Sequence, residues 1–177
     1  MKNQNLTLPN ILTSLRIVLV PVFLISVLEQ KLTLAIIIFS FCTVSDFLDG
    51  HIARQRGQRT KLGAFLDPLA DKFLLLSSFI LLAALNYLPL WMPIVIITKD
   101  LIVFIGWWLR LHIIGKSEVA PTFLGKTTTF LEMAVILLVL IGIPENIFHI
   151  AKFIMLIAII ISSFDYIVSG ITEIETK

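Results

Sequence analysis

Residues 46–71 read DFLDGHIARQRGQRTKLGAFLDPLAD, and this polar segment stands between two apolar runs of the chain. Its four carboxylates fall into two pairs. Asp46 and Asp49 are three positions apart and form the first pair. Asp67 and Asp71 are four positions apart and form the second. Either spacing places two side chains on one face of a helix. The segment therefore predicts two helices that each present two carboxylates, joined by a basic connection.

The chain around this segment is strongly apolar. Of its 177 residues, 58% are hydrophobic and 15% are charged, and its mean hydropathy is +0.98. A soluble domain is about 45–50% apolar and about 25% charged. The 14 Lys and Arg residues and the 12 Asp and Glu residues are too few to cover a water-facing surface. The composition excludes a soluble globular protein and indicates a membrane protein with several spans.

Six apolar runs are candidates to cross a bilayer as helices, which takes about 20 residues for about 30 Å of hydrocarbon. They cover Ile11–Leu28, Leu32–Phe47, Phe73–Leu88, Trp91–Leu111, Thr127–Ile143 and Ile147–Val168. Because lipid offers no hydrogen bonds to the backbone, runs of this length are expected to be helical. The sequence predicts an all-α integral membrane protein, a bundle of six transmembrane helices in which residues 1–177 form one domain.

Basic residues lie mostly on one side of these six spans, and cytoplasmic loops are the ones enriched in Lys and Arg. The basic residues of that side are Lys2, Arg54, Arg56, Arg59, Lys61, Lys72, Arg110, Lys116, Lys126 and Lys177. The opposite side has Lys31 and Lys152. We therefore expect both termini and the 46–71 segment of this multi-pass protein to face the cytoplasm. The membrane is expected to be a bacterial inner membrane.

The residue types of the 46–71 segment suit a bound pyrophosphate. Four neighbouring carboxylates repel one another, and bound cations remove this repulsion. Oxygen ligands without a cysteine or histidine cluster favour Mg²⁺ or Mn²⁺ over Zn²⁺. Two such ions about 3.5–4 Å apart stabilise the attacking and leaving oxygens of a phosphoryl centre. Gly50 and Gly63 permit a ligand to approach the backbone closely, and the guanidinium of Arg54 pairs in a fork with phosphate oxygens.

The whole pattern reads Asp46-x-x-Asp49-Gly50-x-x-Ala53-Arg54, eight residues, then Gly63-x-x-x-Asp67-x-x-x-Asp71. It is far more specific than one pair of aspartates, which is common in loops between spans. Eight fixed positions match by chance on the order of once in 10¹⁰ registers. An alternative of a different class is a cation-coupled transporter, which places carboxylates near the bilayer centre on broken helices. Here the four aspartates lie at the membrane edge, in a basic segment. Their position favours a phosphate site over an ion pathway.

The pattern resembles, position for position, the signature of the CDP-alcohol phosphatidyltransferase family. Members of this family are membrane enzymes with six transmembrane helices, usually homodimers, which transfer a substituted phosphate from a CDP-linked alcohol to an acceptor hydroxyl and release CMP. The resemblance implies two divalent metal ions, Mg²⁺ or Mn²⁺, held by Asp46, Asp49, Asp67 and Asp71. It implies that Asp71 is also the base that deprotonates the acceptor. The residues that it places beside the CDP moiety are Asp49, Gly50, Ala53, Arg54 and Gly63.

Three further segments resemble the phosphatidylglycerophosphate synthase branch of the family, whose donor is CDP-diacylglycerol and whose acceptor is sn-glycerol 3-phosphate. They are Asn10-x-x-Thr13-x-x-Arg16, Phe123–Thr129 and Ser162-x-x-Asp165-Tyr166. An anionic acceptor needs basic partners, and Arg110 and Lys126 stand at the cytoplasmic edges of the fourth and fifth spans. We take these two as candidates for the acceptor phosphate. The equal alternative is that both are anchors at the membrane surface.

Cardiolipin synthases share the signature, and their acceptor is the lipid phosphatidylglycerol. Lys99-Asp100 and Pro121–Phe123 resemble them at least as much as the other branch. Phosphatidylglycerol is therefore the alternative acceptor. The implied partners are CDP-diacylglycerol, one of these two acceptors, membrane lipid and a second copy of the chain, with no nucleic acid.

Some ionisable residues lie inside predicted spans, where charges are costly and usually have a role. They are Arg16, Lys99, Asp100, Glu132 and Asp165. For Arg16 and Lys99 we expect ion pairs with acidic groups of other helices, ahead of a catalytic role. Arg16 has a second interpretation, as a contact of the donor headgroup, since it lies one or two turns into the first helix.

Overall fold

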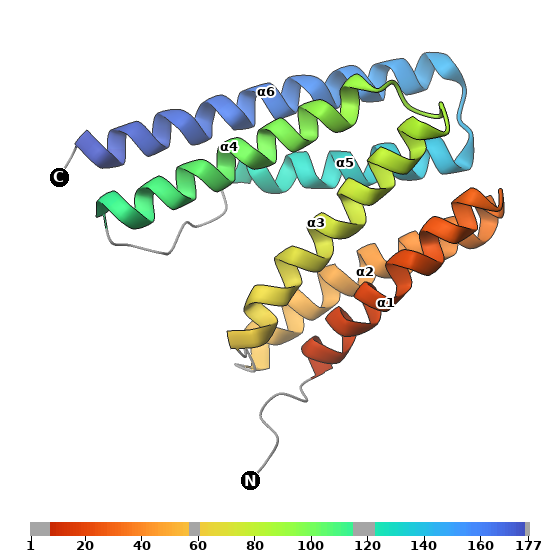
Figure 1. The fold of residues 1–177 in the computed structure, drawn as a ribbon, viewed down its shortest axis with the longest axis horizontal. Coiled ribbons are helices and arrows are strands. Elements are labelled where there is room, and N and C mark those ends of the chain that lie inside the picture. Colours follow the sequence, from red (N-terminus) through yellow and green to blue (C-terminus); the bar gives the residue numbers. More distant parts are fainter. Residues whose placement is uncertain (1–7, 57–60, 115–122, 176–177) are drawn as a thin grey trace, which may run out of the picture. The chain divides into compact units, whose positions relative to one another are not determined.

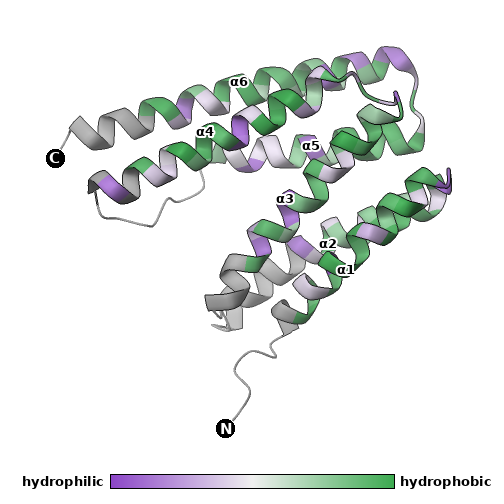
Figure 2. Ribbon diagram, viewed as in Figure 1, coloured by the Kyte–Doolittle hydropathy of each residue, from purple (hydrophilic) through white to green (hydrophobic). Residues whose placement is uncertain are grey.

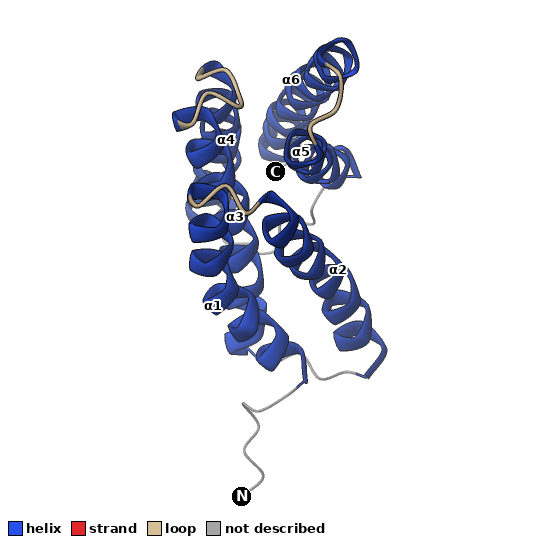
Figure 3. Cartoon of the chain, turned by 90° about the vertical axis from the view of Figure 1, so that its right-hand side faces the viewer, coloured by secondary structure: helices blue, strands red, loops and turns tan. Residues whose placement is uncertain are grey.

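A computed structural model describes the backbone of residues 8–56, 61–114 and 123–175, with the side chains of residues 11–46, 66–109, 112 and 123–168. Within these ranges the chain forms six α-helices and no strand (Figures 1 and 3). The helices are α1 Leu8–Leu28, α2 Leu32–Arg56, α3 Lys61–Ala84, α4 Trp91–Ile114, α5 Phe123–Ile141 and α6 Glu145–Glu175. The prediction of an all-α protein is confirmed for this part of the chain, and each of the six apolar runs overlaps one helix.

Among the residues that the structure describes, four helices contain a stretch long and apolar enough to cross a membrane (Figure 2). These stretches are Ile11–Leu28, Trp91–Leu109, Phe123–Ile141 and Glu145–Val168. α2 has a shorter apolar stretch, Leu32–Asp46, that ends at the first signature aspartate. The protein is therefore a helical membrane protein, while the crossing of α2 and α3 stays a prediction.

The helices α2 and α3 extend well beyond the apolar runs that predicted them. α2 continues past Asp46 to Arg56, and α3 begins at Lys61, twelve residues before Phe73. The extensions are rich in Leu, Ala, Arg, Lys and Gln, which have high helix propensity whether or not they face lipid. Both aspartate pairs consequently stand on helices, as their spacing predicts.

The described residues divide into two compact units. The first covers residues 1–82, with α1, α2 and most of α3, and the second covers residues 83–177, with α4, α5 and α6. In the first unit α1 packs along α2, with the rings of Phe23 and Phe39 in tilted contact at 5.5 Å between centroids. The expectation of one domain over residues 1–177 stays a prediction.

In the second unit α6 packs against both α4 and α5. Its Tyr166 is buried and donates a hydrogen bond from its hydroxyl to the carbonyl oxygen of Val103 on α4, at 3.0 Å. The ring lies on Gly106, where an added Cβ would stand 2.5 Å from Tyr166 Cε1. The close contact between α4 and α6 therefore depends on having glycine, which has no Cβ, at position 106.

Replacing Gly106 with Ala is expected to destabilise the protein by about 1–3 kcal/mol, as overpacking of a tight contact does. The new methyl group must displace the Tyr166 ring and lengthen its bond to Val103. Thermal unfolding of the purified protein in detergent measures the effect. Tyr166→Phe is the matched control, since it removes the hydrogen bond and keeps the ring in place. Unfolding of Gly106→Ala at the wild-type temperature would show that the ring does not rest on this glycine.

Candidate active site

Three of the four signature aspartates have described side chains, and all three belong to the first unit. Asp46 stands at the end of the apolar stretch of α2, and Asp67 and Asp71 lie one turn apart on α3. The side chain of Asp46 is 31% exposed and that of Asp71 is 19% exposed. These carboxylates are thus partly covered by protein and still open to a ligand.

Arg16 of α1 lies between α2 and α3 and contacts a carboxylate on each. Its side chain is fully buried, with Nη1 2.7 Å from Asp46 Oδ1 and 3.8 Å from Asp71 Oδ1. Since one nitrogen contacts both oxygens, the two carboxylates are close neighbours. The expectation that Arg16 pairs with an acidic group of another helix is confirmed.

Thr13 adds a second contact from the same helix. Its hydroxyl donates a short hydrogen bond to Asp67 Oδ1, and the residue is fully buried. Thr13 and Arg16 are three positions apart and share one face of α1. α1 therefore supplies a hydrogen-bond donor to Asp46 and to Asp67, and a cation 3.8 Å from Asp71. The Thr-x-x-Arg spacing in the sequence already places Thr13 and Arg16 on one helix face. The contact of both residues with the signature aspartates was not predicted from the sequence.

The chemistry of this cluster fits divalent cations. Its ligands are hard carboxylate oxygens, which suit Mg²⁺ and Mn²⁺. Two carboxylates, of Asp46 and Asp71, contact one guanidinium, and Asp67 contacts a neutral hydroxyl. The three therefore carry an excess of negative charge that divalent cations would neutralise. Among the described side chains, no three acidic, histidine or cysteine groups surround a common point. Residues Asp46, Asp67 and Asp71 would hold such ions together with Asp49, whose side chain lies outside the described set.

Most other predicted site residues also lie outside the described side chains. Asp49, Gly50, Ala53 and Arg54 stand on α2, Gly63 on α3 and Arg110 on α4. Lys126 is exposed in the first turn of α5, in the second unit. The assignments of these residues to CDP and to the acceptor phosphate stay predictions.

Apolar helices and neighbouring carboxylates at the end of an apolar stretch are features expected of a membrane enzyme that acts on phosphates. The chain matches the sequence model of the CDP-alcohol phosphatidyltransferase family over residues 6–164. A probable phosphatidylglycerophosphate synthase of Mycobacterium tuberculosis is 35% identical over 177 residues, covering 94% of this chain and 83% of that protein. A CDP-diacylglycerol–glycerol-3-phosphate 3-phosphatidyltransferase of Bacillus subtilis is 36% identical over 154 residues, covering 77% and 78%. A cardiolipin synthase (CMP-forming) of Streptomyces coelicolor is 38% identical over 133 residues, covering 71% and 60%.

The chain therefore belongs to the CDP-alcohol phosphatidyltransferase family. It is an enzyme of phospholipid biosynthesis that transfers a phosphatidyl group from CDP-diacylglycerol. Enzymes of this family generally depend on divalent metal ions, which agrees with the chemistry of the aspartate cluster.

Proposed function

We propose that the protein transfers the phosphatidyl group of CDP-diacylglycerol to the hydroxyl of glycerol 3-phosphate and releases CMP. The observation that carries the proposal is the convergence of Asp46, Asp67 and Asp71 on the donors of α1. The choice of acceptor is supported by the Bacillus subtilis relative, whose name specifies glycerol 3-phosphate. The probable phosphatidylglycerophosphate synthase of Mycobacterium tuberculosis supports it over nearly the whole chain.

In this proposal Asp46, Asp49, Asp67 and Asp71 hold two divalent ions, Mg²⁺ or Mn²⁺. Such ions, when bound, neutralise a pyrophosphate and polarise the phosphorus under attack. Arg16 and Thr13 orient the carboxylates through the contacts described above. Gly50, Ala53, Arg54 and Gly63 border the CDP moiety.

Asp71 has a second task as general base. It takes the proton from the acceptor hydroxyl, whose oxygen then forms a bond to the phosphorus that bears the diacylglycerol. The bond from that phosphorus to the bridging oxygen of the pyrophosphate breaks, and CMP leaves with the electron pair. Asp71 suits the role because its carboxylate is partly exposed and is oriented by Arg16.

The placement in the membrane belongs to the same proposal. We infer six crossings, one domain, and an active site that faces the cytoplasm of a bacterial cell. The four long apolar helices support this topology, as does the position of Asp46 at the end of the apolar stretch of α2. A site at that depth lets the acyl chains of the donor remain in lipid while a water-soluble acceptor enters from the cytoplasm. The working unit is proposed to be a homodimer.

The second candidate function is cardiolipin synthesis with phosphatidylglycerol as acceptor. The Streptomyces coelicolor cardiolipin synthase, 38% identical over 133 residues, supports it. Both candidates use the same donor, cations and base, so they differ only in the acceptor.

Release of CMP decides between these candidates. The purified protein, supplied with CDP-diacylglycerol and Mg²⁺, receives one acceptor at a time. We expect release that requires glycerol 3-phosphate and that stops when a chelator removes the metal. Release that instead requires phosphatidylglycerol would contradict the proposed acceptor and support cardiolipin synthesis. Absence of release with either acceptor would contradict both.

A further inference from the structure

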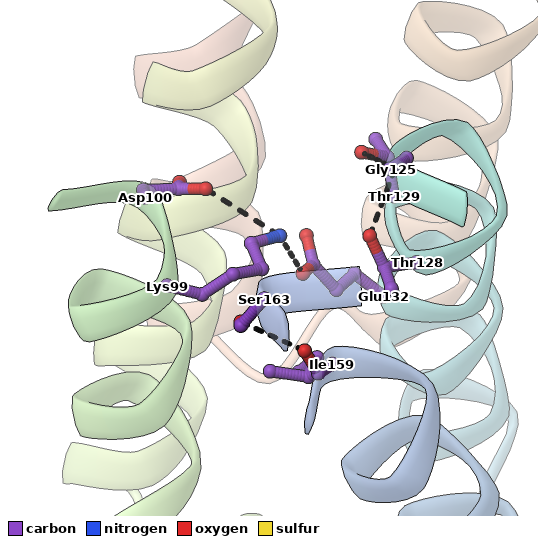
Figure 4. A network of polar contacts seen from close by, with 8 residues as sticks. All are labelled: Lys99, Asp100, Gly125, Thr128, Thr129, Glu132, Ile159 and Ser163. Carbon is purple, nitrogen blue, oxygen red and sulfur yellow. Dashed lines mark hydrogen bonds and ion pairs between the residues drawn. The ribbon is translucent and has the colours of Figure 1, made fainter. Parts of the chain in front are cut away.

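A buried ion pair joins α4 to α5, and no step of the proposed reaction uses it. The Nζ of Lys99 lies 2.5 Å from the Oε1 of Glu132. The two side chains are 6% and 1% exposed. Figure 4 shows Lys99 reaching from α4 toward Glu132 on α5, beside Ser163 of α6. The expectation that Lys99 pairs with an acidic group of another helix is thus confirmed, and the question is what the pair does.

Both residues stand near the middle of their apolar stretches, Trp91–Leu109 and Phe123–Ile141. Charges are costly at that depth and are rare unless they have a role. Two apolar side chains of similar volume generally stabilise a protein as well as a buried ion pair does. Stability alone therefore gives no reason for this pair, whereas fixing the register of two helices is the best-attested reason to keep one.

In the described part of the second unit, α6 holds α4 and α5 through backbone-close packing, while the direct link between α4 and α5 is made by side chains. α4 and α5 each pack closely against α6, and they approach each other little. The lysine and glutamate side chains bridge the remaining separation. A shift of one helix by a single turn, about 5.4 Å, would separate the two charged groups. The pair therefore forms at one relative height of α4 and α5.

The relative height of α4 and α5 also determines how far apart along the bundle their two ends lie that are expected to face the cytoplasm. Arg110 follows Lys99 by eleven positions, close to three turns, so the two share a face of α4 together with Gly106. Lys126 precedes Glu132 by six positions, which is about 9 Å along α5. The helices α4 and α5 run in opposite directions (Figure 1). Arg110, near the end of α4, and Lys126, near the start of α5, therefore stand at the same end of the unit.

We propose that Lys99 and Glu132 are positioning residues for the acceptor: their ion pair fixes the register of α4 against α5, and thereby the height of Arg110 relative to Lys126. This inference rests on the proposed function and on the sequence-based assignment of Arg110 and Lys126 to the acceptor phosphate. An ion pathway through the pair is disfavoured, because Glu132 is 1% exposed and α5 is a continuous helix without proline.

Asp100 provides a matched control within the same network. Its Oδ1 lies 3.4 Å from Lys99 Nζ, on the side opposite Glu132 (Figure 4). Because Asp100 belongs to α4, as Lys99 does, its contact cannot fix α4 against α5. Loss of this carboxylate changes the charge around Lys99 and leaves the bridge between the helices in place.

The test compares Michaelis constants in the full-length protein with Mg²⁺. The double variant Lys99→Met/Glu132→Met removes both charges together and leaves no unpaired charge in the membrane. We expect KM for the acceptor that the wild type uses to rise about tenfold, while KM for CDP-diacylglycerol and kcat stay within about twofold. The exchanged pair Lys99→Glu/Glu132→Lys restores a bridge and is expected to bring the acceptor KM back to within about threefold of the wild type. Asp100→Asn is expected to leave the acceptor KM within twofold.

An unchanged acceptor KM in the double variant, or an equal rise for donor and acceptor, would overturn the proposal and leave the pair a packing feature. An equal rise in Asp100→Asn would also overturn it, since local charge would then explain the effect. If the double variant does not fold, Glu132→Asp replaces it, because the shorter side chain keeps the charge and strains the bridge. A rise in the acceptor KM alone in Glu132→Asp supports the proposal. An acceptor KM equal to that of the wild type overturns it. The identity of the acceptor is decided separately by the wild-type assay, so a wrong acceptor and a wrong register role give different results.

Discussion

Replacing Asp71 with Asn is expected to abolish turnover, with a fall in kcat of about 10³–10⁴-fold, because one change removes a general base and a cation ligand together. The amide has the shape of the carboxylate but accepts no proton at neutral pH and carries no charge. The side chain is 19% exposed and has Arg16 at 3.8 Å, so the substitution leaves little unfilled space. The loss should therefore appear in the chemistry and not in folding.

The measurement is the rate of CMP release, with thermal unfolding and the oligomeric state as checks on the fold. Asp100→Asn makes the same chemical change at a position in the second unit whose side chain is 17% exposed. We expect that control to retain its activity and the Asp71 variant to unfold at nearly the wild-type temperature. Activity of Asp71→Asn within tenfold of the wild type would contradict the assignment of base and ligand.

The helices of this protein are predictable from its apolar runs, but their ends are not. Each run overlaps one of the six helices of the described residues, because lipid requires internal hydrogen bonds. Hydropathy does not determine where a helix stops outside the lipid. α2 runs ten residues past Asp46 because its polar extension still favours helix.

The aspartate site is predictable in its ligands and less so in its surroundings. Spacing alone places Asp67 and Asp71 on one face of a helix. The donors that hold these carboxylates come from α1, and Thr13 is separated from Asp67 by 54 positions. A spacing rule within one helix carries no information on such a contact. Likewise, an acidic partner for Lys99 is predictable from the cost of its charge in lipid, but the choice of Glu132 follows from tertiary packing.

Replacing Arg16 with Met is expected to make the stability of the first unit dependent on divalent metal. Without the guanidinium, Asp46, Asp67 and Asp71 repel one another, and Asp46 and Asp71 lose the cation that contacts both of them. Breaking a buried ion pair costs about 3–5 kcal/mol, and the partial exposure of Asp46 and Asp71 reduces the cost here to about 1–3 kcal/mol. In a chain of this size each kcal/mol corresponds to about 2–4 °C in Tm.

Thermal unfolding with and without Mg²⁺ measures this effect. Added metal binds the folded cluster and not the unfolded chain, so it raises Tm by mass action. Because the metal must then supply all of the neutralising charge, the rise should be larger in Arg16→Met than in the wild type. CMP release should still fall by about 10–100-fold, as is usual when a partner that orients metal ligands is lost.

Arg16→Lys separates charge from geometry in this experiment. The lysine keeps a cation beside Asp46 and Asp71 but loses the planar fork of the guanidinium. We expect its metal-dependent rise in Tm to match that of the wild type, while its activity stays low. An equal rise in Arg16→Met and the wild type would show that Arg16 is not the counter-ion of the cluster. In that case its buried contact with Asp46 would serve only to pack α1 against α2.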